Sequence, residues 1–126
     1  MKFDDLRALW RRERFEWGRT DCIMSVCNHV RDLTGTDPAG PWRGSYSDEA
    51  GAAAICAAHG GVLGLMRHGM ALAGFATGPR GPGRPVVCLI GGHEIAGVDM
   101  GQRIAFMAEG RGMVEMRAEV LEAWVL

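Results

Sequence analysis

The sequence lacks the features that mark membrane proteins, disulfide-rich secreted scaffolds and common nucleotide-binding folds. No stretch approaches the ~20 apolar residues of a membrane span, so we expect none. The first residues, 1–5, are acidic and hold no apolar run, which predicts that no secretory leader begins there. The four cysteines show no disulfide-framework spacing, so we expect reduced thiols and folding in a cytosol-like compartment. Neither a Gly-x4-Gly-Lys-Ser/Thr loop nor a Gly-x-Gly-x-x-Gly turn between a strand and a helix is present.

The charge balance excludes a second group of functions. The formal net charge is −1, which gives no global electrostatic case for nucleic acid or an anionic membrane as the main partner. Only Arg11, Arg12 and Arg14 cluster, and such a cluster is typical of the solvated face of a helix. With 126 residues, 48% apolar and 23% charged, the chain suits one globular domain over residues 1–126.

The order of the predicted elements indicates an α+β fold. Apolar spacing and capping signals predict helices over 3–14, 21–33, 47–59 and 62–73. Glycine-punctuated β runs follow at 85–90, 94–100, 103–108 and 113–116, and a short element closes the sequence at Trp124-Val125-Leu126. Residues 36–46 and 77–85 are expected to be irregular loops. We therefore expect N-terminal helices packed on a small C-terminal antiparallel sheet.

The third predicted helix is rich in alanine. Ala50, Ala53, Ala54 and Ala57 carry little side-chain bulk, so we expect another element to pack closely against them.

Cys22 is the first candidate for chemistry. Thr20 or Asp21 can cap the second helix, which places Cys22 in its first turn, near free N–H groups and the positive end of the helix dipole. That environment lowers the pKa of a thiol, as a nucleophile requires, but a base must also lie within hydrogen-bond reach. The alternative is that Cys22 is a small buried apolar residue.

His93 is the histidine that could serve as this base, if its strand packs against the second helix. His29 lies seven residues after Cys22, about 10 Å along the helix axis, which is too far. His59 and His68 fall at helix C-termini.

No metal site and no cofactor are expected. Structural zinc sites use close cysteine pairs, whereas Cys22 and Cys27 point about 140° apart on one helix. Cys56 and Cys88 have no cysteine near them in the sequence.

The segment Trp17-Gly18-Arg19-Thr20-Asp21-Cys22 resembles a family of phage and prophage tail-region proteins, distant relatives of the NlpC-type papain-like cysteine peptidases. Two further family motifs follow in the same order and spacing. They are Thr34-Gly35-Thr36-Asp37 and Arg43-Gly44-Ser45-Tyr46. The resemblance implies a papain-like fold, in which the structural motif comprises Trp17, Gly18, Arg19, Asp21, Arg43, Gly44 and Tyr46. We expect Trp17, Arg43 and Tyr46 to cluster at the Cys22 end of the helix and hold the 36–46 loop.

Two departures from the active peptidases decide what this resemblance implies about function. Laid on the strand that carries their histidine, Gly97 and Gly101 coincide with its glycines, and the histidine position falls on Ile95. The position of the third, orienting residue falls near Phe106. An apolar side chain takes no proton from a thiol, so the resemblance implies a catalytically inactive tail-assembly or tail-tip component.

The partners implied by the resemblance are other phage tail or tail-tip proteins, and host peptidoglycan for an active form. The protein would be made in the bacterial cytoplasm and end in the virion tail. The alternative is an active cysteine peptidase or amidase that cleaves peptidoglycan, with Cys22 as nucleophile and His93 as base. A host interaction module unrelated to virions is a third hypothesis.

Overall fold

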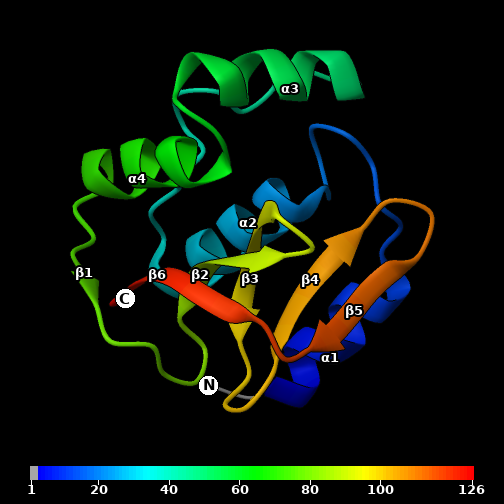
Figure 1. Ribbon diagram of the computed structural model, residues 1–126, viewed down its shortest axis with the longest axis vertical. Coiled ribbons are helices and arrows are strands. Elements are labelled where there is room, and N and C mark those ends of the chain that lie inside the picture. Colours follow the sequence, from blue (N-terminus) through cyan, green and yellow to red (C-terminus); the bar gives the residue numbers. More distant parts are fainter. Residues whose placement is uncertain (1–2) are drawn as a thin grey trace.

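The computed structural model describes residues 3–126, and the N-terminal prediction for Met1 and Lys2 lies outside them. Within the described residues four helices precede six strands. Figure 1 shows how these elements are arranged. The helices are α1 (Phe3–Arg12), α2 (Cys22–Thr34), α3 (Glu49–Ala58) and α4 (Val62–Leu72). The strands are β1 (Thr77–Gly78), β2 (Pro85–Ile90), β3 (His93–Asp99), β4 (Ile104–Ala108), β5 (Gly112–Met116) and β6 (Glu119–Trp124).

The strands form one antiparallel sheet in the order β1-β6-β2-β3-β4-β5. The predicted α+β class and the antiparallel sheet are therefore confirmed. The short closing element is a full strand, β6, which lies between β1 and β2 rather than at the end of the sheet. The loop expected at 77–85 contributes the two-residue strand β1, which pairs with β6.

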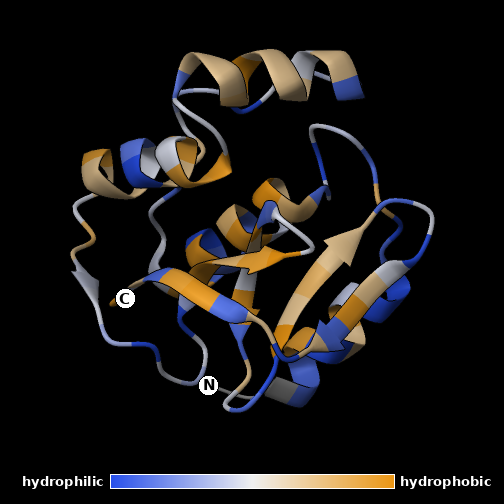
Figure 2. Ribbon diagram, viewed as in Figure 1, coloured by the Kyte–Doolittle hydropathy of each residue, from blue (hydrophilic) through white to orange (hydrophobic). Residues whose placement is uncertain are grey.

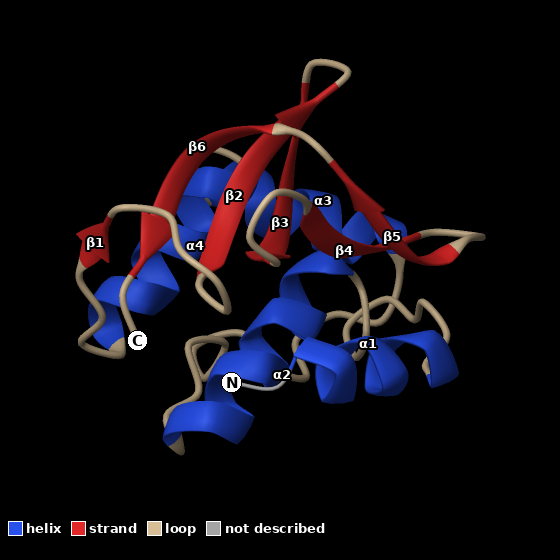
Figure 3. Cartoon of the chain, turned by 90° about the horizontal axis from the view of Figure 1, so that it is seen from below, coloured by secondary structure: helices blue, strands red, loops and turns tan. Residues whose placement is uncertain are grey.

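Figure 3 shows the helices on one side of the sheet, with α2 beneath its middle strands. The main core lies between these layers, because alternate strand residues point toward the helices. Val87, Ala96, Val98, Ala105 and Met107 belong to this inner face. A smaller cluster on the other face of the sheet contains Val86, Cys88, Ile104 and Ala123, with Ile95 packed against it.

A glycine allows β3 and β4 to approach closely. A Cβ atom at Gly97 would lie 2.6 Å from Cγ2 of Ile104 and 2.7 Å from the carbonyl oxygen of Ala105. The two strands pair only at Val98↔Ala105 and Asp99↔Ile104. A side chain at position 97 would therefore push β4 away from β3.

Helix α3 differs from the expectation for it. Only Ala52 is buried in this helix, and Ala50, Ala53, Ala54 and Ala57 are exposed. The expectation that another element packs closely on these alanines is wrong within the described residues. Figure 2 shows that the helix is apolar along its length after Glu49.

Among the described residues no single helix is long and apolar enough to cross a membrane, and only the pair α3 and α4, bent by 71°, meets that length and composition together.

Candidate functional site

The start of α2 is fixed by a buried carboxylate. Asp21 is the N-cap residue and is only 2% exposed. Its Oδ1 accepts a hydrogen bond from the backbone N–H of Met24 at 2.9 Å. Its Oδ2 accepts from the backbone N–H of Gly18 at 2.8 Å and from the hydroxyl of Tyr46 at 2.6 Å. One carboxylate therefore ends the turn before α2, caps the helix and holds the 36–46 loop.

Gly18 is required by the backbone of this turn. Its φ is +84°, in the left-handed region, and a Cβ atom there would lie 2.1 Å from the carbonyl oxygen of Tyr46. Trp17, the preceding residue, donates from Nε1 to the Glu109 carboxylate at 2.8 Å, which ties the turn to the connection between β4 and β5. The guanidinium of Arg19 lies in solvent, and it is the carbonyl of Arg19 that accepts a hydrogen bond from Asn28.

Arg43 joins the other two motifs. Its Nε and one terminal nitrogen bind the two carboxylate oxygens of Asp37 at 2.7 and 3.0 Å, and its other terminal nitrogen donates to Asn28 at 2.8 Å. This forked ion pair holds the pKa of Asp37 below its ordinary value. Gly44 follows in the left-handed region, with φ at +82°.

The expected cluster at the Cys22 end is confirmed for two of its three members. Trp17 and Tyr46 line one pocket together with Cys22. Arg43 instead lies beside Asn28, about 9 Å further along the α2 axis at 1.5 Å per residue. Its planar guanidinium matches the geometry of the Asp37 carboxylate. Asp37 falls in a separate motif of the sequence, and no partner was predicted for it.

Cys22 is the first residue of α2 and is half-buried. Burial of its thiol, and after it the negative charge of the neighbouring Asp21, raise the pKa to about 12. Backbone hydrogen bonds from Ala96 and Ile23 act in the opposite direction and are outweighed. The thiol is therefore protonated at neutral pH, and the lowering of its pKa that a helix start favours is outweighed.

The pocket beside Cys22 has a volume of about 290 Å³ and is lined mainly by apolar side chains. A second cysteine, Cys56 of α3, lines the same pocket, and burial raises its pKa as well. Sequence reasoning missed Cys56, because 33 residues separate it from Cys22 and no motif links them. Within residues 3–126 no three His, Cys, Asp or Glu side chains come together in a metal-binding group.

The structure does not bring His93 to Cys22. His93 is exposed at the first position of β3, opposite Ile90, and strand alternation places it on the face away from α2. Ile95 also lies on that face, packed on the smaller cluster. The interpretation of Ile95 as the base position facing Cys22 is therefore wrong by one residue, and Ala96 faces the thiol. The same offset applies on β4, where Ala105 and Met107 face the helices and Phe106 does not belong to the main core.

On the inner face of β3, the strand also carries one polar side chain, that of Glu94. Its Oε1 accepts the backbone N–H of Leu63 at 3.1 Å, which caps the start of α4. The remaining histidines have other partners: Nε2 of His29 lies 3.0 Å from the carbonyl oxygen of Gly83, and the ring of His59 lies against that of His68, tilted by 43°.

The site can therefore hold a neutral thiol at the end of an apolar pocket, but among the described residues no imidazole adjoins it. A family model described as "Domain of unknown function (DUF6950)" matches residues 2–126. No curated protein and no solved structure matches the chain.

Proposed function

The chain belongs to the DUF6950 family, and from its own residues we propose that it is a structural component of a phage or prophage tail, with a papain-like fold that has lost peptidase activity. The three motifs over residues 17–46 supply the phage assignment and the papain-like comparison. The protein would be made in the bacterial cytoplasm and would bind other tail or tail-tip proteins.

One observation supports the loss of activity above all others: the side of Cys22 that faces the sheet meets Ala96. A cysteine nucleophile needs a base to take its proton, or an environment that already favours the thiolate. Alanine supplies no base, and both burial and the Asp21 charge favour the neutral thiol. Neither route to an active nucleophile is therefore provided.

A second observation gives the motif a purpose without catalysis. Asp21 binds Gly18, Met24 and Tyr46, and Arg43 binds Asp37 and Asn28. These contacts hold the 17–21 turn and the 36–46 loop against α2. The motif residues are thus accounted for as a scaffold that keeps two exposed loops in one conformation, as an assembly component needs.

The test of this proposal is a murein zymogram of the purified protein beside its Cys22→Ala variant. We expect no clearing by either protein, with a known cysteine amidase on the same gel as the positive control. Clearing by the wild type that disappears in Cys22→Ala would overturn the proposal. The tail assignment is tested separately, by mass spectrometry of purified particles: the chain is expected in the tail fraction and absent from soluble host protein.

The alternative, an active peptidase or amidase, is favoured by the position of Cys22 at a helix N-terminus beside an open pocket. It requires a base that reaches the sulfur within about 3–4 Å during turnover. His93 would have to move from the opposite face of β3, which would break the β2–β3 pairing at Ile90↔His93. The zymogram separates the two functions.

A further inference from the structure

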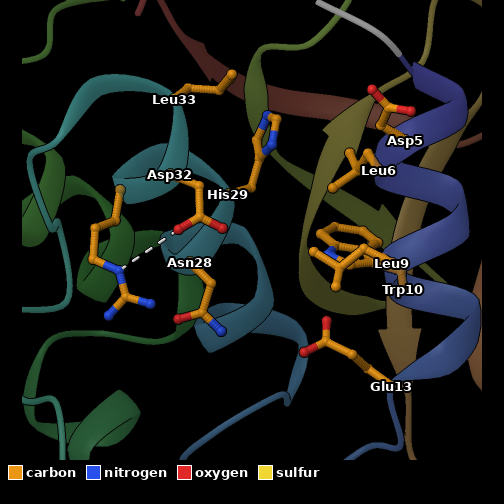
Figure 4. A pocket seen from close by; sticks show the side chains of 10 residues that line it. Asp5, Leu6, Leu9, Trp10, Glu13, Asn28, His29, Asp32 and Leu33 are labelled. Atoms are coloured by element: carbon orange, nitrogen blue, oxygen red, sulfur yellow. Dashed lines mark ion pairs between the residues drawn. The ribbon is translucent and has the colours of Figure 1, made fainter.

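A groove separates α1 from α2, and its walls carry mostly negative charge. It has a volume of about 430 Å³ (Figure 4). The floor is apolar, made by Leu6, Leu9 and Trp10 of α1, and Leu33 of α2 stands half-exposed at its edge. Three carboxylates border the groove, from Asp5, Glu13 and Asp32, against the single guanidinium of Arg31.

These carboxylates are not neutralised by the rest of the described chain. Asp5 and Glu13 make no ion pair among residues 3–126, and Asp32 meets only Arg31, at 3.9 Å. Burial raises the pKa of Glu13, the charge of Asp32 raises it further, and the charge of Arg12 lowers it by less.

A buried acceptor also points to a cationic occupant. His29 lines the groove and is only 5% exposed. Its Nε2–H donates to the carbonyl of Gly83 at 3.0 Å, which leaves Nδ1 as a lone-pair acceptor. Burial lowers the pKa of His29, so the ring is neutral at pH 7 and can accept a hydrogen bond. The groove thus combines an apolar floor, acids at its edge and a free acceptor, which suits a guanidinium flanked by apolar groups.

The same chain carries exposed guanidinium groups around a second hollow near the end of α1. Arg11 in the last turn of α1, Arg14 after that helix, and Arg111 in the turn between β4 and β5 border this hollow. Its lining also contains Phe15, Met113 and one carboxylate, that of Glu13. None of the three guanidinium groups makes an ion pair or a side-chain hydrogen bond within the described residues. We name this surface the basic patch. Glu13 lines both this hollow and the groove, so the basic patch adjoins the groove of its own chain and, as a neighbouring surface, cannot fill it.

We propose that the groove between α1 and α2 receives the basic patch of a second copy of this chain, so that copies associate head to tail. The two surfaces consist of different residues apart from Glu13, so in this head-to-tail arrangement each contact leaves one groove and one patch free. Contacts of this kind form rings when the rotation closes and filaments when it does not. This inference goes beyond the proposed function and holds for the purified protein alone, whether or not the tail assignment is correct.

The test is the mass of the protein in solution, measured by sedimentation equilibrium. In 50 mM NaCl the weight-average mass is expected to rise with concentration past that of a dimer. In 1 M NaCl, where the screening length is about 3 Å, it should fall toward the monomer. A monomer at every concentration and salt would overturn the proposal.

Two variants separate the two surfaces. Asp32→Lys alters the groove and Arg111→Glu alters the patch, and both positions are exposed, outside the hydrogen-bond network of the motifs. Each variant alone is expected to be monomeric. An equimolar mixture should form dimers and nothing larger, because only one competent contact remains between the two.

Matched controls with the same charge changes are Glu119→Lys and Arg117→Glu, both exposed and outside the two surfaces. They are expected to associate like the wild type, and circular dichroism checks that all four variants fold. Association that survives in both altered variants, or dimers formed by each variant alone, would overturn the head-to-tail arrangement.

Discussion

The pKa of the Cys22 thiol gives the sharpest measure of whether this site can act as a nucleophile. Burial and the Asp21 charge raise it from the ordinary 9.0 to about 12. At pH 8 a shift of three units lowers the thiolate fraction by a factor of about 1,000. Since alkylation proceeds through the thiolate, the rate should fall by a similar factor relative to the unfolded chain.

The assay is reaction with iodoacetamide between pH 7 and pH 11, followed on the Cys22 peptide by mass spectrometry, because four cysteines are present. We expect the rate to rise about tenfold per pH unit up to pH 11 without a plateau. The protein unfolded in urea gives the reference. Asp21→Asn is the matched variant, because asparagine also caps helices but carries no charge, and Cys22 should react faster in it. A wild-type rate that is already level from pH 7 upward would refute this reasoning and favour an activated cysteine.

Three further expectations concern the scaffold around Cys22, each measured by urea unfolding. Tyr46→Phe removes the hydroxyl that donates to the buried carboxylate at the helix cap, and should lower the free energy of unfolding by about 1.5–3 kcal/mol, whereas a loss under about 0.5 kcal/mol would contradict that role. Gly18→Ala should cost about 1–3 kcal/mol more than Gly74→Ala, because both glycines have positive φ but only position 18 meets backbone; equal losses would count against the clash. In Arg43→Met the free energy of unfolding should fall less steeply as the pH is lowered. The contribution of Asp37 is present above its ordinary pKa of 3.8 and is lost as pH falls through the lowered folded value, so an unchanged slope in the variant would exclude it.

The sequence was sufficient to predict the four helices and the strands β2 to β5 because their signals are local. The apolar spacing of α2, with a capping residue before it and Gly35 after it, needs no information from elsewhere in the chain. The β runs between glycine turns fall within one or two residues of β2 to β5. The cap at Asp21 and the position of Cys22 at the helix start follow from the same local pattern.

The site itself depended on the register and on long-range packing, which the pattern does not contain. Side chains alternate along a strand, so a displacement of one residue exchanges the two faces, and this moved the base position from Ala96 to Ile95. Cys56 reaches the Cys22 pocket only because α3 folds back toward the start of α2, and Glu94 reaches Leu63 only because α4 packs on β3. Arg43 was misplaced for a similar reason, since its partner was decided by the fold of the 36–46 loop.

The place of β6 between β1 and β2 has a consequence for how the protein is made. The ribosome delivers residues in order, and β2 has its β3 partner long before residues 119–124 emerge. Until then one edge of β2 is bare, and the main core lacks Trp124, which is 1% exposed in the finished fold. Between the emergence of β2 and that of β6 the nascent chain therefore presents an unpaired strand edge, in the form that chaperones recognise and that pairs wrongly with neighbouring chains.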